Sequence, residues 1–305
     1  MIARMSVTVR AAAKINLRLA VGPPREDGFH PLLTVYQAIS LYDDVTVSDA
    51  DAWSVAVEPT GDLDCSGAPL DGSNIAVRAG RLLSTHHGVR RAAAIRIAKG
   101  IPVAGGLAGG SADAAAALVA LDRLWDLNTT DEDLLRLAAE LGSDVPFALI
   151  GGTARGTGRG EVVEQIEDPG TWWWVVVANA TGMSTPEVYR EFDRLYPDLL
   201  SHHHLRVHDM PGILRTRDFR LLGRNLENDL QPAALSLRPD LEQTDLDLFE
   251  ARAFRLLSGS GPTFLGLVET QERAHEVCEH MLDRGYRDIR VATGPVAGAH
   301  VVEYA

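Results

Sequence analysis

Hydrophobic and polar residues alternate along the first part of the chain. Apolar side chains occupy the odd positions from Val7 to Val21, whereas Lys14, Asn16 and Arg18 occupy even positions. A period of two predicts a β-strand, in which successive side chains point to opposite faces of the sheet. We therefore expect these three polar side chains to share one face, away from the packed side of the strand.

Similar patterns predict further strands and helices along the rest of the chain. In the first half, strands are expected over 34–41, 44–47, 53–57 and 92–98, and helices over 74–85, 112–125 and 131–141. In the second half, strands are expected over 162–166, 172–178, 263–268 and 289–293, and helices over 186–195 and 271–284. Thr130 and Asp133 resemble a capping box at the start of one of these helices. This order is compatible with a mixed α and β protein but does not single out one fold.

Glycines are concentrated between Gly151 and Gly160. We interpret this segment as a flexible connection, because glycine has the greatest backbone freedom. The length of 305 residues is enough for about two domains. We therefore expect an N-terminal domain over 1–158 and a C-terminal domain over 159–305.

Composition narrows the class of partner and the compartment. The chain has 29 Lys and Arg against 42 Asp and Glu, a formal charge of -13, so its field repels nucleic acid and anionic membrane surfaces. Two cysteines cannot build a disulfide framework, which favours a reducing compartment. Apolar runs fall far short of the roughly 20 residues that span a bilayer. We expect a cytoplasmic protein that binds neither nucleic acid nor membranes.

A glycine-rich loop precedes the helix expected from residue 112. Backbone amides in such a loop can converge on one point, and the helix N-terminus adds the positive end of a dipole, so the segment suits a phosphate group. It has neither the lysine of a Walker A loop nor G-x-G-x-x-G spacing. A plain glycine-rich connection is the alternative. The loop consists of Pro102, Val103, Ala104, Gly105, Gly106, Leu107, Ala108, Gly109, Gly110, Ser111 and Ala112.

Two ionisable residues are candidates to act together with this loop in phosphoryl transfer. Transfer of a phosphoryl group requires a cation that the loop itself lacks, and Lys14 is a candidate. Asp144 lies between Ser143 and Val145-Pro146, where a helix N-cap is the simplest interpretation and a catalytic carboxylate is the alternative.

Three other segments have both a structural and a functional interpretation. Phe29 and His30 lie among turn-forming residues, which form either a hairpin loop or a surface that stacks on a flat heterocycle. Ser258–Gly261 is either a simple turn or a ligand loop. The run His202–His204 has no accompanying Cys or carboxylate cluster, so we do not interpret it as a metal site.

Together these segments resemble the GHMP kinase superfamily, and within it the family of 4-diphosphocytidyl-2-C-methyl-D-erythritol kinases of the non-mevalonate isoprenoid route. The resemblance covers nearly the whole chain. The glycine loop indicates the superfamily, and Gly28-Phe29-His30 with the Lys14-x-Asn16 strand narrows it to this member. The other matching segments are Gly142–Pro146, Thr185-Pro186 followed by Tyr189, Asn228–Leu230 and Ser258–Pro262.

The resemblance implies an α+β fold with two domains. The N-terminal domain would be of the ribosomal protein S5 domain 2 type, and the C-terminal domain would be ferredoxin-like. The implied activity is an ATP-dependent kinase that uses Mg²⁺ and phosphorylates the 2-hydroxyl of its small-molecule substrate, 4-diphosphocytidyl-2-C-methyl-D-erythritol. We expect a monomer or a weak homodimer.

The resemblance also assigns roles to residues. Asp144 would be the base near the acceptor hydroxyl, with Lys14 as its cationic partner. The glycine loop would wrap the ATP phosphates, with Ser111 near Mg²⁺, and the adenosine end would lie by Asn74 and Lys99. Phe29 and Tyr189 would sandwich the cytosine and His30 would hydrogen-bond to its edge, so that the substrate residues are Asn16, Phe29, His30, Thr185 and Tyr189.

The chain departs from the family pattern at three positions. Phe29 stands where Tyr is frequent, which keeps a stacking ring but loses a hydroxyl. Ala108 and Ala112 replace small Gly or Ser positions of the loop. Two alternatives stay open: another kinase of the superfamily, for homoserine, mevalonate or a sugar, and a nucleotide-binding regulator without catalysis.

Overall fold

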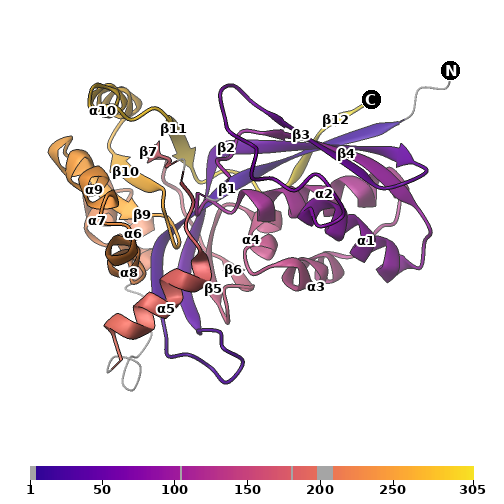
Figure 1. Cartoon of the computed structure of the whole chain (residues 1–305), viewed down its shortest axis with the longest axis horizontal. Helices are drawn as coiled ribbons and strands as arrows, with labels where there is room; N and C mark the ends of the chain where they lie inside the picture. The colour runs from indigo at the N-terminus through magenta and orange to yellow at the C-terminus, as the bar shows by residue number, and fades with distance from the viewer. Residues whose placement is uncertain (1–4, 104, 180, 198–208) are drawn as a thin grey trace.

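The part of the chain that the structure describes forms two β-sheets, each with its own helices (Figure 1). The computed structural model describes residues 5–103, 105–179, 181–197 and 209–305. Ala104 and the run His202–His204 lie outside these ranges.

The first sheet has the strand order β12-β1-β2-β4-β3. Its long strands β1 and β2 pair antiparallel over nearly their whole length, and β12 returns from the end of the chain to pair with β1. Short strands β5 and β6 extend the sheet from β2, and β8 pairs with β1. The strands are β1 (Ser6–Val21), β2 (Leu32–Ala50), β3 (Ser54–Pro59), β4 (Ala92–Lys99), β5 (Thr153–Thr157), β6 (Val162–Gln165), β8 (Glu227–Asn228) and β12 (His300–Tyr304).

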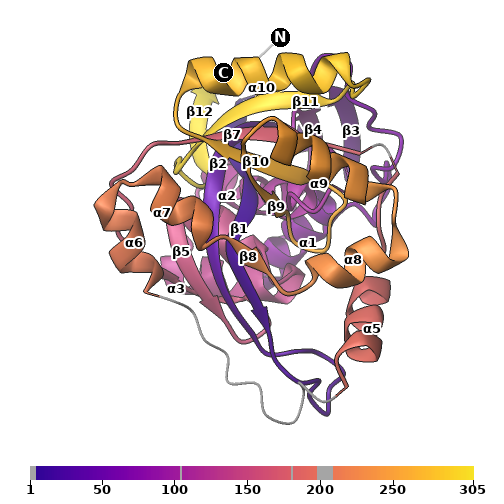
Figure 2. The ribbon, with the colours of Figure 1, turned by 90° about the vertical axis from the view of Figure 1, so that its left-hand side faces the viewer.

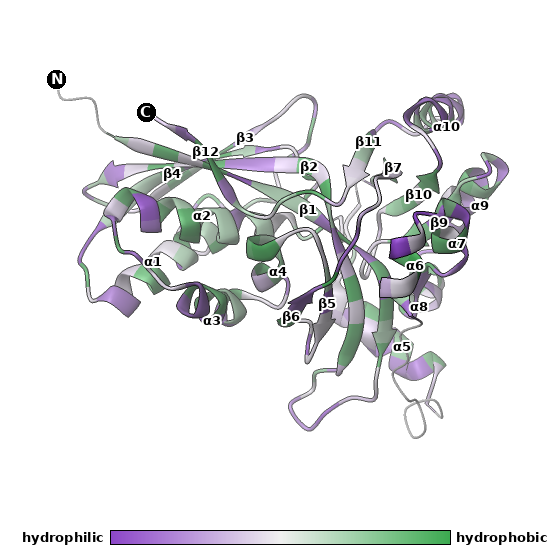
Figure 3. Cartoon of the chain, turned by 180° about the vertical axis from the view of Figure 1, so that it is seen from behind, coloured by the Kyte–Doolittle hydropathy of each residue, from purple (hydrophilic) through white to green (hydrophobic). Residues whose placement is uncertain are grey.

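Four helices pack beside this sheet (Figure 1): α1 (Ile75–His87), α2 (Gly109–Trp125), α3 (Asp131–Leu141) and α4 (Val145–Ile150). Helix α2 is almost entirely buried, and its alanines let it approach β1 and β2 closely. Thr130 Oγ1 accepts a hydrogen bond from the Asp133 backbone N–H at 3.2 Å, so the predicted cap is confirmed. Figure 3 shows hydrophobic residues along β1, β2 and α2, where the main core lies.

The second sheet has the order β11-β7-β10-β9, and Figure 2 shows it face on with its helices around it. Trp172 and Trp174 of β7 are buried, as their place in a valine-rich run suggests. The elements are β7 (Trp172–Val177), β9 (Phe254–Leu257), β10 (Phe264–Val268), β11 (Ile289–Gly294), α5 (Thr185–Leu195), α6 (Met210–Thr216), α7 (Phe219–Arg224), α8 (Gln231–Leu237), α9 (Leu241–Glu250) and α10 (Gln271–Asp283).

We expected the polar face of β1 to point away from the packed side of the strand, and this expectation is wrong. Lys14, Asn16 and Arg18 are only 5%, 2% and 7% exposed. Lys14 Nζ donates to Asn16 Oδ1 at 3.1 Å, so these two do share a face. That face is buried because other parts of the chain cover it and supply polar partners, which the strand pattern alone cannot reveal.

The glycine-rich segment 151–160 is not a flexible connection. It contains β5, which pairs with β2, and a side-chain carbon at Gly156 or Gly160 would collide with Tyr36. The two strands expected over 34–41 and 44–47 are likewise one continuous strand, β2. The predicted boundary after residue 158 falls between the paired strands β5 and β6, and the division into two domains stays a prediction.

Candidate functional site

A cavity of about 1020 Å³ lies between the glycine loop, β1, β2 and α5. Leu107, Ser111 and Ala112 do not line it, and Ala104 lies outside the described residues. The predicted residues that line it are Lys14, Asn16, Phe29, His30, Asn74, Lys99, Pro102, Val103, Gly105, Gly106, Ala108, Gly109, Gly110, Asp144, Thr185 and Tyr189. One cavity therefore brings together residues from most of the motifs.

Lys14 and Asp144 meet inside this cavity. Lys14 Nζ lies 3.2 Å from Asp144 Oδ2, and their side chains are 7% and 30% exposed. Asp144 occupies the N-cap position of α4, but its side chain makes no capping hydrogen bond. Asp144 can therefore begin α4 and also act in the cavity, because its carboxylate pairs with Lys14 and not with the helix backbone.

The glycine loop is pressed against the turn Ser258–Gly261. Gly106 has φ +75°, and a side-chain carbon there would collide with the carbonyl oxygens of Ser258 and Gly261. Ser258 Oγ donates to the Gly106 carbonyl at 3.0 Å. Only glycine meets both the backbone angle and this close approach.

The loop ends at Ala108, which lies in the left-handed region at φ 56° and ψ 32° and is the N-cap of α2. No side chain caps this helix. The amides of its first turn, from Gly109 to Ser111, have no acceptor within the helix and lie at the positive end of its dipole. This geometry suits an anion such as phosphate.

The turn Ser258–Gly261 also contributes to the cavity. Sequence analysis left open whether this segment is a simple turn or a ligand loop. Gly259 and Ser260 line it, and Ser260 Oγ lies 2.8 Å from Thr185 Oγ1. Asn228 Nδ2 donates to the carbonyls of Leu257 and Gly259, which holds the turn in place. The interpretation as a ligand loop is therefore favoured over that of a simple hairpin turn.

Lys99 is held between two carboxylates. Its Nζ lies 2.6 Å from Asp43 Oδ2 and 2.9 Å from Asp113 Oδ2. Burial opposes the charge on Lys99, but the carboxylates outweigh it and raise its pKa. Burial, together with Asp43 and against the attraction of Lys99, raises the pKa of Asp113 well above its usual range.

Asn74, the other residue expected at the adenosine end, is also engaged within the protein. It is the N-cap of α1, where its Oδ1 accepts from the Ala76 N–H at 2.9 Å and its Nδ2 donates to the Pro69 carbonyl at 2.7 Å. Asn74 and Lys99 line the cavity, but both side chains already have protein partners.

The opposite end of the cavity is aromatic. Phe29 is 51% exposed, and the Arg159 guanidinium lies 5.0 Å from its ring centroid. The ring centroids of His30 and Tyr189 are 5.1 Å apart, and His30 Nδ1 donates to the Gly22 carbonyl at 2.8 Å. Burial and the nearby Asp144 raise the pKa of Tyr189, so this phenol is neutral.

Sequence analysis missed several polar residues in this cavity. They come from scattered elements whose local patterns carry no sign of a site, and Arg159 lies in the segment that we interpreted as a flexible connection. Only their shared position in the folded chain identifies Tyr36, Asp113, Arg159, Arg190 and Asp193.

Within the described residues, no group of three or more His, Cys, Asp or Glu could hold a metal ion, and no helix is both long and apolar enough to cross a membrane. Cys65 and Cys278 are both free thiols.

Comparisons with known proteins identify the family of this chain. Residues 74–152 match the GHMP kinases N terminal domain. The chain is 56% identical to the 4-diphosphocytidyl-2-C-methyl-D-erythritol kinase of a Nocardioides species, over 97% of this chain and 100% of that protein. The relative from Thermobifida fusca with the same name is 49% identical, over 97% and 98% of the two chains.

Solved structures show the same fold. A crystal structure of 4-(cytidine 5'-diphospho)-2C-methyl-D-erythritol kinase superposes with a TM-score of 0.75 and 30% identity, over 94% of this chain and 98% of that one. These findings confirm the α+β GHMP kinase fold and the resemblance. The chain belongs to the 4-diphosphocytidyl-2-C-methyl-D-erythritol kinase family of ATP-dependent GHMP kinases.

Proposed function

We propose that this chain transfers the γ-phosphoryl group of ATP to the 2-hydroxyl of 4-diphosphocytidyl-2-C-methyl-D-erythritol. The observation that carries this proposal is the pairing of Lys14 and Asp144 at 3.2 Å in the cavity that the glycine loop and the aromatic residues share. An ammonium, a carboxylate and a phosphate-binding loop in one cavity are the parts that phosphoryl transfer requires.

The glycine loop binds the triphosphate of ATP. Its amides and the start of α2 hold the phosphates without a lysine in the loop, and Lys14 supplies the cation from β1. The backbone N–H of Lys14 donates to the Leu107 carbonyl at 3.0 Å. This bond ties the strand that carries the lysine directly to the loop.

The aromatic end binds the cytidine. Phe29 and Tyr189 both line the cavity, and an exposed ring such as Phe29 gains stacking energy when a flat base covers it. His30 hydrogen-bonds to the edge of the base, and Asn16 and Thr185 contact the rest of the substrate. Both residues line the cavity, and Asn16 Oδ1 accepts from Lys14 Nζ at 3.1 Å.

In the reaction, the acceptor oxygen forms a bond to the γ-phosphorus, and the bond from phosphorus to the β–γ bridging oxygen breaks. The hydroxyl proton passes to Asp144, ADP leaves, and Lys14 balances the negative charge on the transferring group. Positioning of the hindered hydroxyl and charge stabilisation supply most of the rate enhancement.

Mg²⁺ fits the donors that are present. Mg²⁺ prefers oxygen ligands and takes one or two carboxylates or hydroxyls in addition to substrate phosphates. The Asp144 carboxylate is such an oxygen and lines the cavity, whereas the Ser111 hydroxyl at the start of α2 does not line it. Asp144 would therefore hold the ion together with the phosphates of ATP, and the ion would neutralise charge on those phosphates.

Asp144→Asn tests the base. We expect kcat to fall by about 10²- to 10⁴-fold, the usual contribution of a general base, because the amide cannot accept the proton. Folding should be nearly unchanged, because the Asp144 side chain caps no helix. ADP release with Mg-ATP and the cytidine substrate measures the first effect and urea unfolding the second. Turnover within tenfold of wild type would reject this role.

A screen of phosphoryl acceptors with Mg-ATP tests the substrate. We expect activity with the cytidine substrate and none with homoserine, mevalonate or galactose. Phe29→Ala should raise the substrate KM by about tenfold or more, since a stacked aromatic contact contributes on the order of 1–3 kcal/mol. An unchanged KM would contradict the cytidine assignment, and the absence of ADP release with every acceptor would favour a non-catalytic nucleotide-binding protein.

A further inference from the structure

Asp193 of α5 lies in the cavity beside the residues proposed to bind the cytosine. It lines the same cavity as Phe29, His30 and Tyr189. It also follows Tyr189 by four residues on α5, so the two side chains share one face of the helix. Asp193 belongs to none of the sequence motifs that match the family, and the relatives described above assign it no role.

His30 is held in one orientation next to this carboxylate. Its ring is buried and packs on the Tyr189 ring with centroids 5.1 Å apart. Its Nδ1 donates to the Gly22 carbonyl at 2.8 Å, and its Nε2 lies 3.5 Å from Asp193 Oδ2. The carboxylate therefore stands next to the atom with which His30 can hydrogen-bond to the edge of a base.

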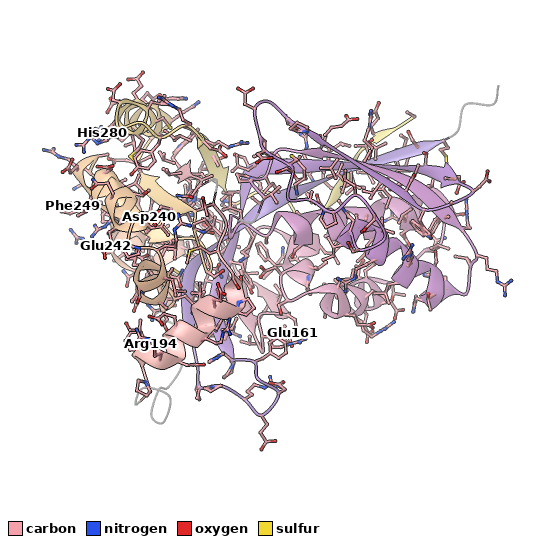
Figure 4. The ribbon with its side chains drawn as sticks, in the orientation of Figure 1. Glu161, Arg194, Asp240, Glu242, Phe249 and His280 are labelled. Atoms are coloured by element: carbon pink, nitrogen blue, oxygen red, sulfur yellow. The ribbon has the colours of Figure 1, made fainter. Side chains whose placement is uncertain are left out.

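The Asp193 carboxylate has more acceptor capacity than the described residues fill. Its side chain is 34% exposed, and its Oδ1 is buried without a hydrogen-bond partner among those residues. The neighbouring arginines of α5 pair elsewhere: Arg190 with Glu187 at 3.8 Å, and Arg194, labelled in Figure 4, with Glu191 at 2.7 Å. A carboxylate with unfilled acceptor positions beside a cavity favours a ligand that brings an N–H donor.

We infer that Asp193 is a specificity-determining residue, whose carboxylate accepts a hydrogen bond from the 4-amino group of cytosine. This inference rests on the proposed function, because it needs the cytosine between Phe29 and Tyr189. Cytosine presents an amino donor at position 4, which carboxylates accept from, whereas uracil presents a carbonyl oxygen there. A carbonyl oxygen and a carboxylate cannot donate to each other, so Asp193 selects cytidine over uridine.

Asp193→Asn keeps the shape of the side chain but supplies an NH₂ group that can face a carbonyl oxygen. Wild-type protein should bind CDP at least about tenfold more tightly than UDP, because uracil loses a hydrogen bond to a charged group. The variant should bind UDP more tightly and CDP more weakly than wild type does, so that the two affinities lie within about threefold. Isothermal titration calorimetry with CDP and with UDP measures both affinities without any turnover.

Glu187→Gln is the matched control, since it removes a carboxylate from the same helix at a position that does not line the cavity. Its preference for CDP should match that of wild type. An unchanged preference in Asp193→Asn would overturn the inference. So would an equal loss of affinity for both nucleotides, because that result would make the role of Asp193 structural. Wild-type protein without a preference for CDP would overturn it as well. Failure of the proposed function would show separately, as a preference for CDP without ADP release from Mg-ATP and the cytidine substrate.

Discussion

At the residue scale, the site depends on side chains whose environment differs from what their sequence position suggests. Lys14 occupies a polar position of an alternating strand, yet it is buried and holds both Asn16 and Asp144. Its charge is therefore in a partly dehydrated site, where electrostatic stabilisation of a transferring phosphoryl group is stronger than in water.

Lys14→Met should remove the charge and keep the apolar stem. We expect kcat to fall by at least about 10²-fold, comparable to the loss for Asp144→Asn, because one preorganised charge interaction contributes on the order of 10²- to 10³-fold. Steady-state ADP release measures this loss, and circular dichroism checks that the variant is folded. A folded variant with unaltered turnover would reassign Lys14 to a structural role.

Ala108 carries backbone strain, since it is a non-glycine residue at φ 56°. The left-handed region costs such residues about 1–2 kcal/mol, so Ala108→Gly should raise the free energy of unfolding by about 0.5–1 kcal/mol after the entropic cost of glycine. Ala112→Gly, one turn farther along the same helix and fully buried, should lower it by about 1 kcal/mol or more. Urea unfolding of both variants tests this opposite pair, and equal signs would contradict it.

At the scale of elements, the glycine loop packs against the Ser258–Gly261 turn from the second sheet. Ser258 bonds to the loop, and Asn228 fixes the turn from β8. The loop is thus held from outside as well as by its own glycines, which keeps its amides converged before the nucleotide arrives.

Gly106→Ala tests this contact. The added carbon would collide with two carbonyl oxygens of the turn, so we expect the KM for ATP to rise by about tenfold or more and the melting temperature to fall. Gly88→Ala is the matched control, because Gly88 also has positive φ but has open space around it. This substitution should lower the free energy of unfolding by only about 1 kcal/mol, the cost of the backbone conformation. If both variants keep the wild-type KM for ATP, the contact between Gly106 and the turn does not shape the loop for ATP.

At the scale of the whole molecule, Gln37 joins the two sheets. It is fully buried in β2, accepts from Trp174 Nε1 of β7 at 2.9 Å and donates to Asp168 Oδ2 at 2.8 Å. The cavity lies where residues carried by both sheets meet, so the relative placement of the sheets sets the distances within it.

Gln37→Leu should lower the free energy of unfolding by about 1–3 kcal/mol, because it leaves the buried indole N–H of Trp174 without its acceptor. Asp168 Oδ2 loses one hydrogen bond but still accepts from Thr153 Oγ1. Gln271→Leu, at an exposed position of α10, should change it by less than about 0.5 kcal/mol. Denaturant unfolding compares the two, and similar values would show that Gln37 does not join the sheets energetically.

Local features of the chain account for what was predictable. The alternation over residues 7–21 specifies β1, and Thr130 with the apolar spacing after it specifies α3, because strand and helix periodicities and caps are properties of neighbouring residues. The composition of the glycine loop likewise indicates an anion site, since glycine and a helix start act within one short segment.

Only the tertiary structure decides which distant groups meet. Asp144 faces Lys14, Lys99 lies between Asp43 and Asp113, and Tyr36 is enclosed by glycines of a segment that we expected to be flexible. These contacts join residues far apart along the chain, and burial then sets their charges and strengthens their interactions. The sequence by itself therefore determined the family, most of the elements and about half of the residues that line the cavity, and the fold decided their partners and their ionisation.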